Sequence, residues 1–151
     1  LWDVGGGAGS VGIEWMRHAP ACRAISIEAR EDRAARITAN AAALGVPGLR
    51  VVLGRAPGAL ADLERPDAVF VGGGVSGPDL LLTAWRALRP GGRLVANAVT
   101  VEGEAALSAF RAVHGGALRR VGVERAEPVG RFSGWRALAG VTQLIHRKES
   151  P

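Results

Sequence analysis

Near its start the chain places four glycines in five consecutive positions, within the run Asp3-Val4-Gly5-Gly6-Gly7-Ala8-Gly9-Ser10. An apolar stretch, Leu1 to Val4, leads into this run, and a helical pattern, Val11 to His18, follows it. So many glycines destabilise a strand-helix junction unless the backbone must approach something closely. In open α/β sheets, ligands bind beyond the carboxyl ends of the strands. The segment therefore predicts a strand, a loop and a helix that hold a ligand against the backbone.

Strand-like and helical segments alternate along the next hundred residues. The strand-like runs are Ala24 to Ile27, Leu49 to Leu53, Ala68 to Gly72 and Leu94 to Val99. The helical patterns are Glu31 to Leu44, Gly58 to Leu63, Asp79 to Leu88 and Gly103 to Val113. This alternation predicts a doubly wound α/β fold with a mostly parallel sheet.

The pattern changes after the last predicted helix. Leu118 to Glu127 and Val141 to Arg147 are strand-like, and a loop rich in glycine and tryptophan joins them without a helix. We expect an antiparallel pair at one sheet edge. Phe132 and Trp135 could stack on the ring of a substrate or pack against this pair, and packing is the prediction. The whole of residues 1–151 is predicted to be one continuous, compact domain.

The composition bears on disulfides, metal sites, membrane spans and the cellular compartment. Cys22 is the only cysteine, so no internal disulfide can form, and no His/Cys cluster has the spacing of a structural zinc site. No apolar run approaches the roughly 20 residues that span a bilayer. We therefore predict a cytoplasmic protein without a metal.

An acidic residue ends the second predicted strand. Glu28 follows the glycine loop by about twenty residues, where a carboxylate can accept hydrogen bonds from both hydroxyls of a ribose. The run Gly7 to Gly12 also fits the G-x-G-x-x-G fingerprint, so a nicotinamide dinucleotide-binding oxidoreductase or module is an alternative. Asp3 favours a cationic cofactor instead, because a carboxylate there would repel a pyrophosphate but could orient the ammonium group of S-adenosylmethionine.

The cofactor is thus predicted to be S-adenosylmethionine, held at the ends of three strands. The third strand ends in Gly54-Arg55-Ala56-Pro57, where an adenine could lie against small residues and backbone groups. The predicted cofactor-binding residues are Asp3, Gly5, Gly6, Gly7, Ala8, Gly9, Glu28, Gly54, Arg55 and Ala56.

The order of these features resembles that of class I methyltransferases. The chain has the acid-and-glycine loop, the acid that ends strand two, Asp67 at the opening of strand four, and the Pro90-Gly91-Gly92 turn before strand five. The resemblance covers nearly the whole chain and implies methyl transfer from S-adenosylmethionine.

Three longer stretches resemble a narrower family, the precorrin-6 carbon-15 methyltransferases of cobalamin biosynthesis. They are Val51 to Pro57, Pro66 to Gly73 and Gly91 to Thr100, and the Asn-Ala-Val-Thr segment that ends the third is the most specific. This resemblance implies methylation of a bridging carbon of a precorrin-6 tetrapyrrole, with decarboxylation of an acetate side chain.

The same resemblance carries expectations about organisation. Family members stand alone or form the C-terminal half of a bifunctional protein, and they are often tetramers. They also carry a segment before the first strand that folds over the cofactor. We expect this sequence, which starts at Leu1, to lack that segment.

Methyl transfer from a sulfonium depends mainly on positioning the nucleophilic carbon, so no residue is assigned as a catalytic acid or base. The glycines after strand four could leave a flat opening for a macrocycle. Arginines on loops, Arg55 among them, could clamp its carboxylates. The further substrate-positioning candidates are Gly72, Gly73, Gly74, Asn97, Thr100, Arg131 and Arg136.

A formal net charge of +5, carried by arginines with Lys148 as the only lysine, raises a class I RNA methyltransferase as another alternative. Against it, the chain lacks the Asn/Asp-Pro-Pro-aromatic motif after strand four that amino-group methylation of bases uses. The expected partner is an anionic tetrapyrrole, without membrane or nucleic acid, in a homo-oligomer.

Overall fold

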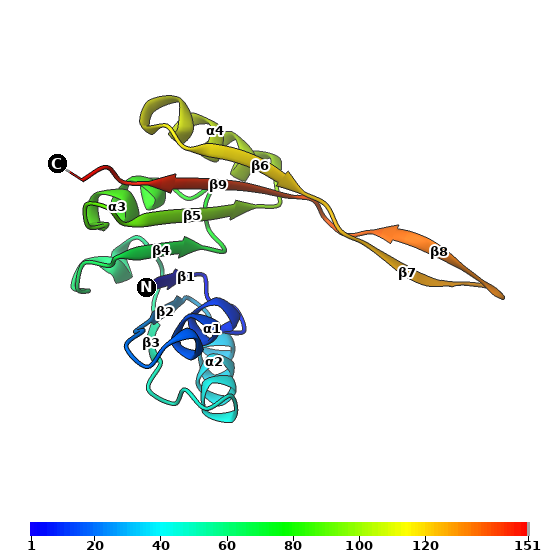
Figure 1. The fold of residues 1–151 in the computed structure, drawn as a ribbon, viewed down its shortest axis with the longest axis horizontal. Coiled ribbons are helices and arrows are strands. Elements are labelled where there is room, and N and C mark those ends of the chain that lie inside the picture. Colours follow the sequence, from blue (N-terminus) through cyan, green and yellow to red (C-terminus); the bar gives the residue numbers. More distant parts are fainter. Residues whose placement is uncertain (151) are drawn as a thin grey trace.

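The computed structural model describes residues 1–150 and contains a seven-stranded sheet of order β3-β2-β1-β4-β5-β9-β6 (Figure 1). Its strands are β1 (Trp2–Val4), β2 (Ile25–Glu28), β3 (Arg50–Leu53), β4 (Ala68–Val71), β5 (Arg93–Ala98), β6 (Ala117–Val121) and β9 (Val141–Arg147). Strands β1 to β5 pair in parallel, whereas β9 is antiparallel to both β5 and β6. The doubly wound, mostly parallel sheet and its antiparallel edge pair are confirmed.

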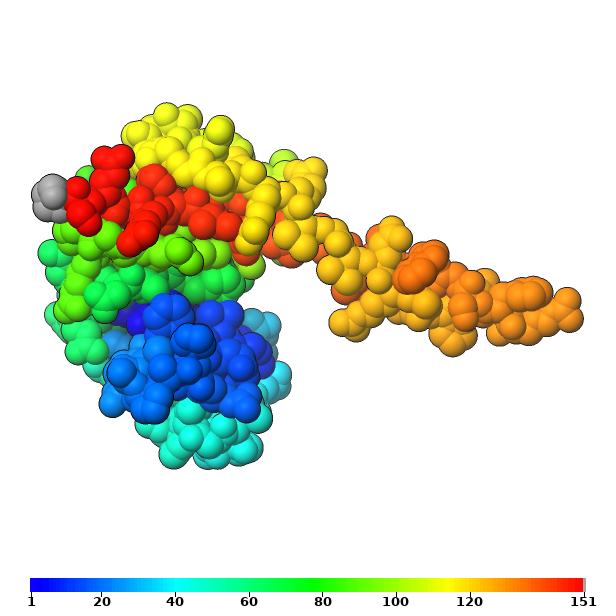
Figure 2. Space-filling view, in the orientation of Figure 1, coloured from blue at the N-terminus to red at the C-terminus, as the bar shows by residue number. Residues whose placement is uncertain are grey.

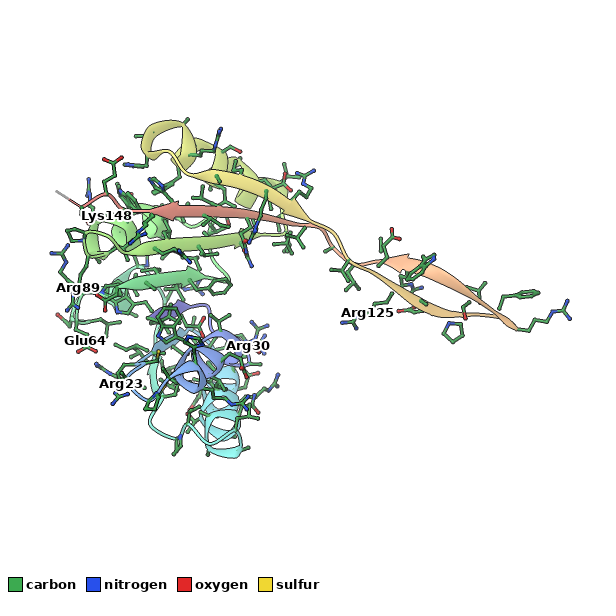
Figure 3. The ribbon with its side chains drawn as sticks, in the orientation of Figure 1. Arg23, Arg30, Glu64, Arg89, Arg125 and Lys148 are labelled. Carbon is green, nitrogen blue, oxygen red and sulfur yellow. The ribbon has the colours of Figure 1, made fainter. Side chains whose placement is uncertain are left out.

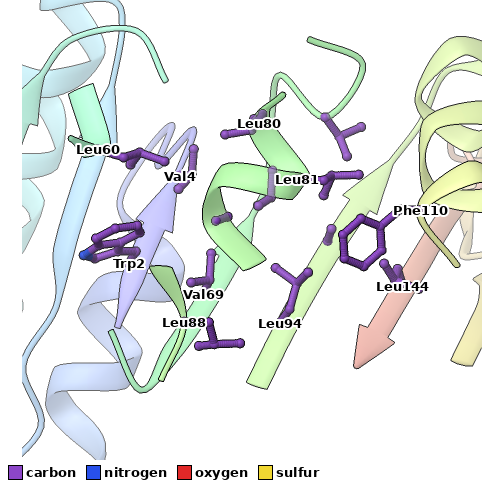
Figure 4. Close-up of a cluster of buried hydrophobic side chains, with 14 of the residues drawn as sticks. Trp2, Val4, Leu60, Val69, Leu80, Leu81, Leu88, Leu94, Phe110 and Leu144 are labelled. Carbon is purple, nitrogen blue, oxygen red and sulfur yellow. The ribbon is translucent and has the colours of Figure 1, made fainter. Parts of the chain in front are cut away.

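Helices cover the two faces of this sheet. They are α1 (Ser10–His18), α2 (Glu31–Ala43), α3 (Leu80–Ala87) and α4 (Val101–His114). A smaller core lies under α1 and α2, where Ile13 and Ile37 are fully buried. A larger core lies under α3 and α4, and Figure 4 shows Leu80 of α3 in the same cluster as Trp2 of β1 and Phe110 of α4. Among residues 1–150, no helix is both long enough and apolar enough to cross a membrane.

The predicted helix Gly58 to Leu63 is wrong in its extent. Only one 3-10 turn, η1 (Gly58–Leu60), forms there. Leu60 is buried in the larger core and Leu63 packs partly against it. The hydrogen bonds of this segment join residues three apart, Ala61 N–H to the Gly58 carbonyl and Leu63 N–H to the Leu60 carbonyl, each at 3.3 Å, so the turn does not continue as an α-helix.

The segment between β6 and β9 is not a packed loop. It forms a separate two-stranded sheet of β7 (Glu124–Val129) and β8 (Phe132–Ala137), closed by the two-residue turn Gly130-Arg131. This sheet projects from the body of the molecule (Figures 1 and 2). We call residues 122–140 the arm.

The arm corrects three predictions. The predicted strand Leu118 to Glu127 breaks at residues 122–123, and the chain is not compact throughout. Phe132 and Trp135 do not pack on the strand pair, because they are 68% and 76% exposed. A strand pattern specifies pairing between neighbours but not whether the resulting hairpin folds back onto the domain.

The arm leaves the sheet at a defined edge. Because β5 and β6 are both antiparallel to β9, β6 runs in the direction of β5 and ends where the parallel strands end. Its root is fastened to α4, since Glu104 accepts hydrogen bonds from Arg120 Nη2 at 2.6 Å and from Thr142 Oγ1 at 2.8 Å.

Candidate nucleoside-binding site

A cavity of about 540 Å³ lies at the carboxyl ends of β1, β2, β3 and β4. Its walls come from Val4-Gly5, Ile27-Glu28-Ala29 with Arg33, the run Gly54 to Pro57, and the loop between β4 and α3. The chain order reverses between β1 and β4, which is where an open α/β sheet forms its ligand crevice.

Another cavity, of about 520 Å³, lies at the opposite edge of the sheet. Figure 3 shows Arg23, Glu64 and Arg89, which line it, away from the carboxyl ends of the strands. The position of ligands in this fold class favours the first cavity.

Glu28 both faces the first cavity and holds the glycine loop. Its side chain is buried; Oε2 accepts a hydrogen bond from the Gly7 N–H and Oε1 accepts one from the Arg30 N–H, each at 3.0 Å. Each carboxylate oxygen has a second lone pair, so both oxygens can still accept from a ribose hydroxyl. Glu28 therefore lines the cavity, and its contact with a ribose stays a prediction.

Asp3 does not line the cavity. It is 1% exposed, and its Oδ2 accepts hydrogen bonds from Ser26 Oγ at 3.0 Å and from the Gly12 N–H at 3.2 Å. Burial raises the pKa of the Asp3 carboxyl, although both hydrogen bonds act in the opposite direction. The carboxylate therefore ties β1 to the start of α1, and its proposed contact with an ammonium group stays a prediction.

Two glycines of the loop are required by close approach. Gly5 has φ +73°, and a Cβ there would lie 2.8 Å from the backbone nitrogen of Gly73, so the loops after β1 and β4 nearly touch. Gly9 has φ +85°, and its Cβ would lie 2.9 Å from Ile37 Cγ2. Of the predicted loop residues, Gly5 lines the cavity, whereas Gly6, Gly7, Ala8 and Gly9 build the loop behind it.

The cavity gathers other predicted residues and adds some that the sequence reasoning missed. Gly54, Arg55 and Ala56 line it, as do the three glycines Gly72 to Gly74. The missed residues include Arg33, Ser76, Gly77 and Pro78. Arg33 lies in the first turn of α2, directly after the strand that Glu28 ends, so the predicted helix start contained a signal for it.

Four substrate-positioning candidates lie outside the cavity. Asn97 Oδ1 accepts a hydrogen bond from Gln143 Nε2 at 2.8 Å, and Thr100 Oγ1 caps α4 by accepting from the Gly103 N–H at 3.1 Å. Arg131 and Arg136 belong to the arm, where Arg136 pairs with Glu127 at 3.3 Å. Arg125 of β7, labelled in Figure 3, lies on the arm, which projects from the body of the molecule.

The strand order, the glycine loop and the acid that ends β2 define a class I methyltransferase fold. A family model described as the precorrin methyltransferase domain matches residues 1–148, and the chain belongs to this family.

Relatives and solved structures agree with this assignment. A precorrin-6Y C(5,15)-methyltransferase [decarboxylating] from Sinorhizobium sp is 54% identical over 143 residues, which are 95% of this chain. The chain spans only 35% of that relative's length.

Two crystal structures share the fold. The C-terminal domain of precorrin-6Y C5,15-methyltransferase from Rhodobacter capsulatus has a TM-score of 0.90 at 47% identity, covering 98% of this chain and 79% of that one. A putative precorrin-6Y C5,15-methyltransferase domain from Corynebacterium diphtheriae has a TM-score of 0.89 at 41% identity, covering 98% and 86%.

Proposed function

We propose that this chain transfers a methyl group from S-adenosylmethionine to a bridging carbon of a precorrin-6 tetrapyrrole, with decarboxylation of an acetate side chain, in cobalamin biosynthesis. The observation that carries the proposal is the cavity at the carboxyl edge, where Glu28 is buried beside two closely approaching glycine loops. The decarboxylating methyltransferase names of the relatives support the choice of substrate.

The lining of the cavity fits the cofactor. Glu28 retains the lone pairs that the two ribose hydroxyls need, and Gly54 and Ala56 leave room for an adenine beside β3. When bound, S-adenosylmethionine supplies an electrophilic methyl group on its sulfonium. The residues of the chain hold the nucleoside, exclude water and leave one side open for the nucleophilic carbon.

The loop after β4 lines the side of the cavity that is left open for the substrate. Gly72, Gly73 and Gly74 carry no side chains that would block a wide, flat substrate. The conjugated nitrogens of the tetrapyrrole supply the electron push, so the chain needs no strong general base. Positioning is thus the main contribution of this domain to catalysis.

The assembly and location are further parts of the proposal. We infer a homo-oligomer, a tetramer as in many members of the family, with the exposed arm as the surface that joins the copies. A cytoplasmic location stays a prediction from the single cysteine.

Mass spectrometry of precorrin-6B incubated with the full-length protein and S-adenosylmethionine tests the function. The change expected from this domain is the gain of one methyl group at the bridging carbon and the loss of one carbon dioxide. Calorimetry with S-adenosylhomocysteine and NAD, side by side, tests the cofactor. Methyl incorporation into RNA, or binding of NAD alone, would replace the proposal by one of the two alternatives.

A further inference from the structure

Two arginines at one end of the cavity have no ion-pair partner among residues 1–150, and they bear on substrate binding if the proposed function, on which this inference rests, is correct. Arg33 and Arg55 both line the cavity and are exposed. Neither forms an ion pair with a described residue, whereas the neighbouring Arg30 pairs with Asp32 at 2.9 Å. Both guanidinium groups are therefore free to bind an anion that enters the cavity.

The backbone holds both arginines near Glu28. The Arg30 N–H, three residues before Arg33, donates to Glu28 Oε1 at 3.0 Å. The Gly54 N–H, next to Arg55, donates to the Glu28 carbonyl oxygen at 2.9 Å. The Glu28 carboxylate forms an ion pair with neither arginine, since its oxygens accept from backbone N–H groups instead. Two separate elements, α2 and the turn after β3, thus bring two unpaired positive charges to one end of the cavity.

The cofactor supplies no anion at this end. With its ribose at Glu28 and its adenine beside Gly54 and Ala56, S-adenosylmethionine places an uncharged adenosine next to the two arginines. Its one carboxylate belongs to the methionine part, which is attached to the opposite side of the ribose from the adenine. Binding of this cofactor therefore does not use the charge of the two arginines.

The other end of the cavity has no cation for a substrate carboxylate. Within residues 1–150, the β4–α3 loop contributes glycines, Ser76 and Pro78 to the lining. A precorrin carries several carboxylates, and guanidinium groups bind carboxylates best. Strands β3 and β4 are three positions apart in the sheet, which is about 14 Å at the usual strand spacing. A tetrapyrrole with acetate and propionate side chains is wide enough to bridge this distance.

We propose that Arg33 and Arg55 bind carboxylates at the rim of the tetrapyrrole and so orient the macrocycle, with its bridging carbon over the β4–α3 loop. These carboxylates are not the acetate that is lost, because an ion pair stabilises a carboxylate against the loss of carbon dioxide. They persist in the product, so the contact binds substrate and transition state alike. Its removal affects KM rather than kcat.

The first test removes both guanidinium groups in the full-length protein. The double variant Arg33→Ala, Arg55→Ala should raise the KM for the tetrapyrrole about tenfold or more, the effect of losing a hydrogen bond to a charged group. Its kcat and its affinity for S-adenosylhomocysteine should stay near those of the wild type. The matched control, Arg36→Ala with Arg86→Ala, removes two exposed arginines outside the cavity and should keep the wild-type KM. An unchanged KM, or a weaker affinity for S-adenosylhomocysteine that accounts for the loss, would overturn the proposal.

The second test removes the charge from the substrate instead. Transfer of a labelled methyl group to the tetrapyrrole methyl ester measures KM even where the ester prevents decarboxylation. Esterification should raise KM strongly in the wild type and much less in the double alanine variant, because the partners of the carboxylates are already absent there. The variant Arg33→Lys, Arg55→Lys keeps the charge but loses the bidentate geometry, so its KM for the free acid should be intermediate. An equal effect of esterification on the wild type and the double alanine variant would contradict the contact.

Wild-type protein in the same assays separates the two proposals. A wild type that methylates the tetrapyrrole, with a KM that the double alanine variant shares, overturns the role of the arginines while the proposed function stands. A wild type that binds S-adenosylhomocysteine but does not methylate the tetrapyrrole overturns the proposed function, and the binding of this substrate by the arginines with it.

Discussion

Glu28 fastens the glycine loop and faces the cavity with the same carboxylate. Its two backbone donors, the N–H groups of Gly7 and Arg30, hold it in one orientation. We expect Glu28→Ala to weaken binding of S-adenosylhomocysteine by about 1.5 to 3 kcal/mol, the range for hydrogen bonds to a charged group. Calorimetry measures the affinity, and Glu31→Ala, an exposed acid three residues on, is the control. Unchanged affinity would remove Glu28 from the site.

Asp3 should make the stability of the domain depend on pH. Because burial raises its pKa in the folded state, the folded protein binds this proton more tightly than the unfolded chain does. The corresponding stabilisation is present below the unfolded-state pKa of aspartate and is lost as the pH rises through the raised value.

Asp3→Asn tests this dependence. The variant cannot take up the proton, so its free energy of unfolding should fall less steeply with pH across that interval than that of the wild type. Urea unfolding at a series of pH values measures the slope, and Asp62→Asn provides an exposed control. A wild-type slope in Asp3→Asn would contradict the assignment.

Among the connecting elements, the loop between β4 and α3 has two possible roles. It either forms the surface on which the substrate meets the methyl group, which we call the substrate floor, or serves only as a turn between the two elements. Gly73 lacks the positive φ that would require glycine, and a Cβ there would meet the Gly5 Cα at an ordinary 3.9 Å. We therefore expect Gly73→Leu to fold and to bind S-adenosylhomocysteine, yet to lose methyl transfer by orders of magnitude because its side chain enters the cavity.

A neighbouring glycine supplies the comparison for this prediction. Gly74 has φ +76°, so Gly74→Leu should lower the thermal midpoint, cofactor affinity and activity together. Measuring these three quantities on both variants decides the matter, and full activity in Gly73→Leu would exclude the substrate floor.

The C-terminal end of α3 depends on the only lysine of the chain. Lys148 Nζ donates to the carbonyl oxygens of Trp85 and Leu88, each at 2.8 Å, and the Leu88 oxygen also accepts from Arg65 Nη2 at 3.3 Å. We expect Lys148→Met to lower the free energy of unfolding by about 1 to 3 kcal/mol. Denaturant unfolding measures it against Arg86→Met, an exposed residue in the last turn of α3. Equal stability of the two variants would show that the cap contributes nothing.

At the scale of the whole molecule, we expect the arm to be needed for the assembly of copies but not for the folding of the domain. Val123 and Leu138 already lie together at its base, where the Leu138 N–H donates to the Val123 carbonyl at 2.9 Å. Replacing residues 124–137 by a two-residue Asn-Gly turn should leave the circular dichroism of the domain native-like. The same variant should be monomeric by light scattering if the arm joins the copies, whereas an unchanged mass would place the interface elsewhere.

Much of the candidate site was predictable because it depends on local sequence. The glycines between β1 and α1, the acid that ends β2 and the small residues after β3 and β4 each follow a strand. Parallel strands bring their carboxyl ends to one edge whatever the rest of the chain does. Glu28, Gly54 and the glycines Gly72 to Gly74 therefore line the cavity as expected.

The directions of individual side chains were not predictable in the same way. Successive side chains on a strand point to opposite faces, and the packed neighbours decide which face is which. Asp3 thus points to Ser26 and α1, while Arg33, in the first turn of α2, lines the cavity wall.

The sequence by itself determined the order of the strands and helices, the antiparallel edge and the glycine loop, because backbone periodicity and glycine conformation are local properties. Only the tertiary structure decided that β7 and β8 extend away from the domain and carry Arg131 and Arg136 out of reach of their own cavity. The physical reason is that a hairpin satisfies its backbone hydrogen bonds internally. The surface on which its side chains come to rest is set by contacts distant in sequence.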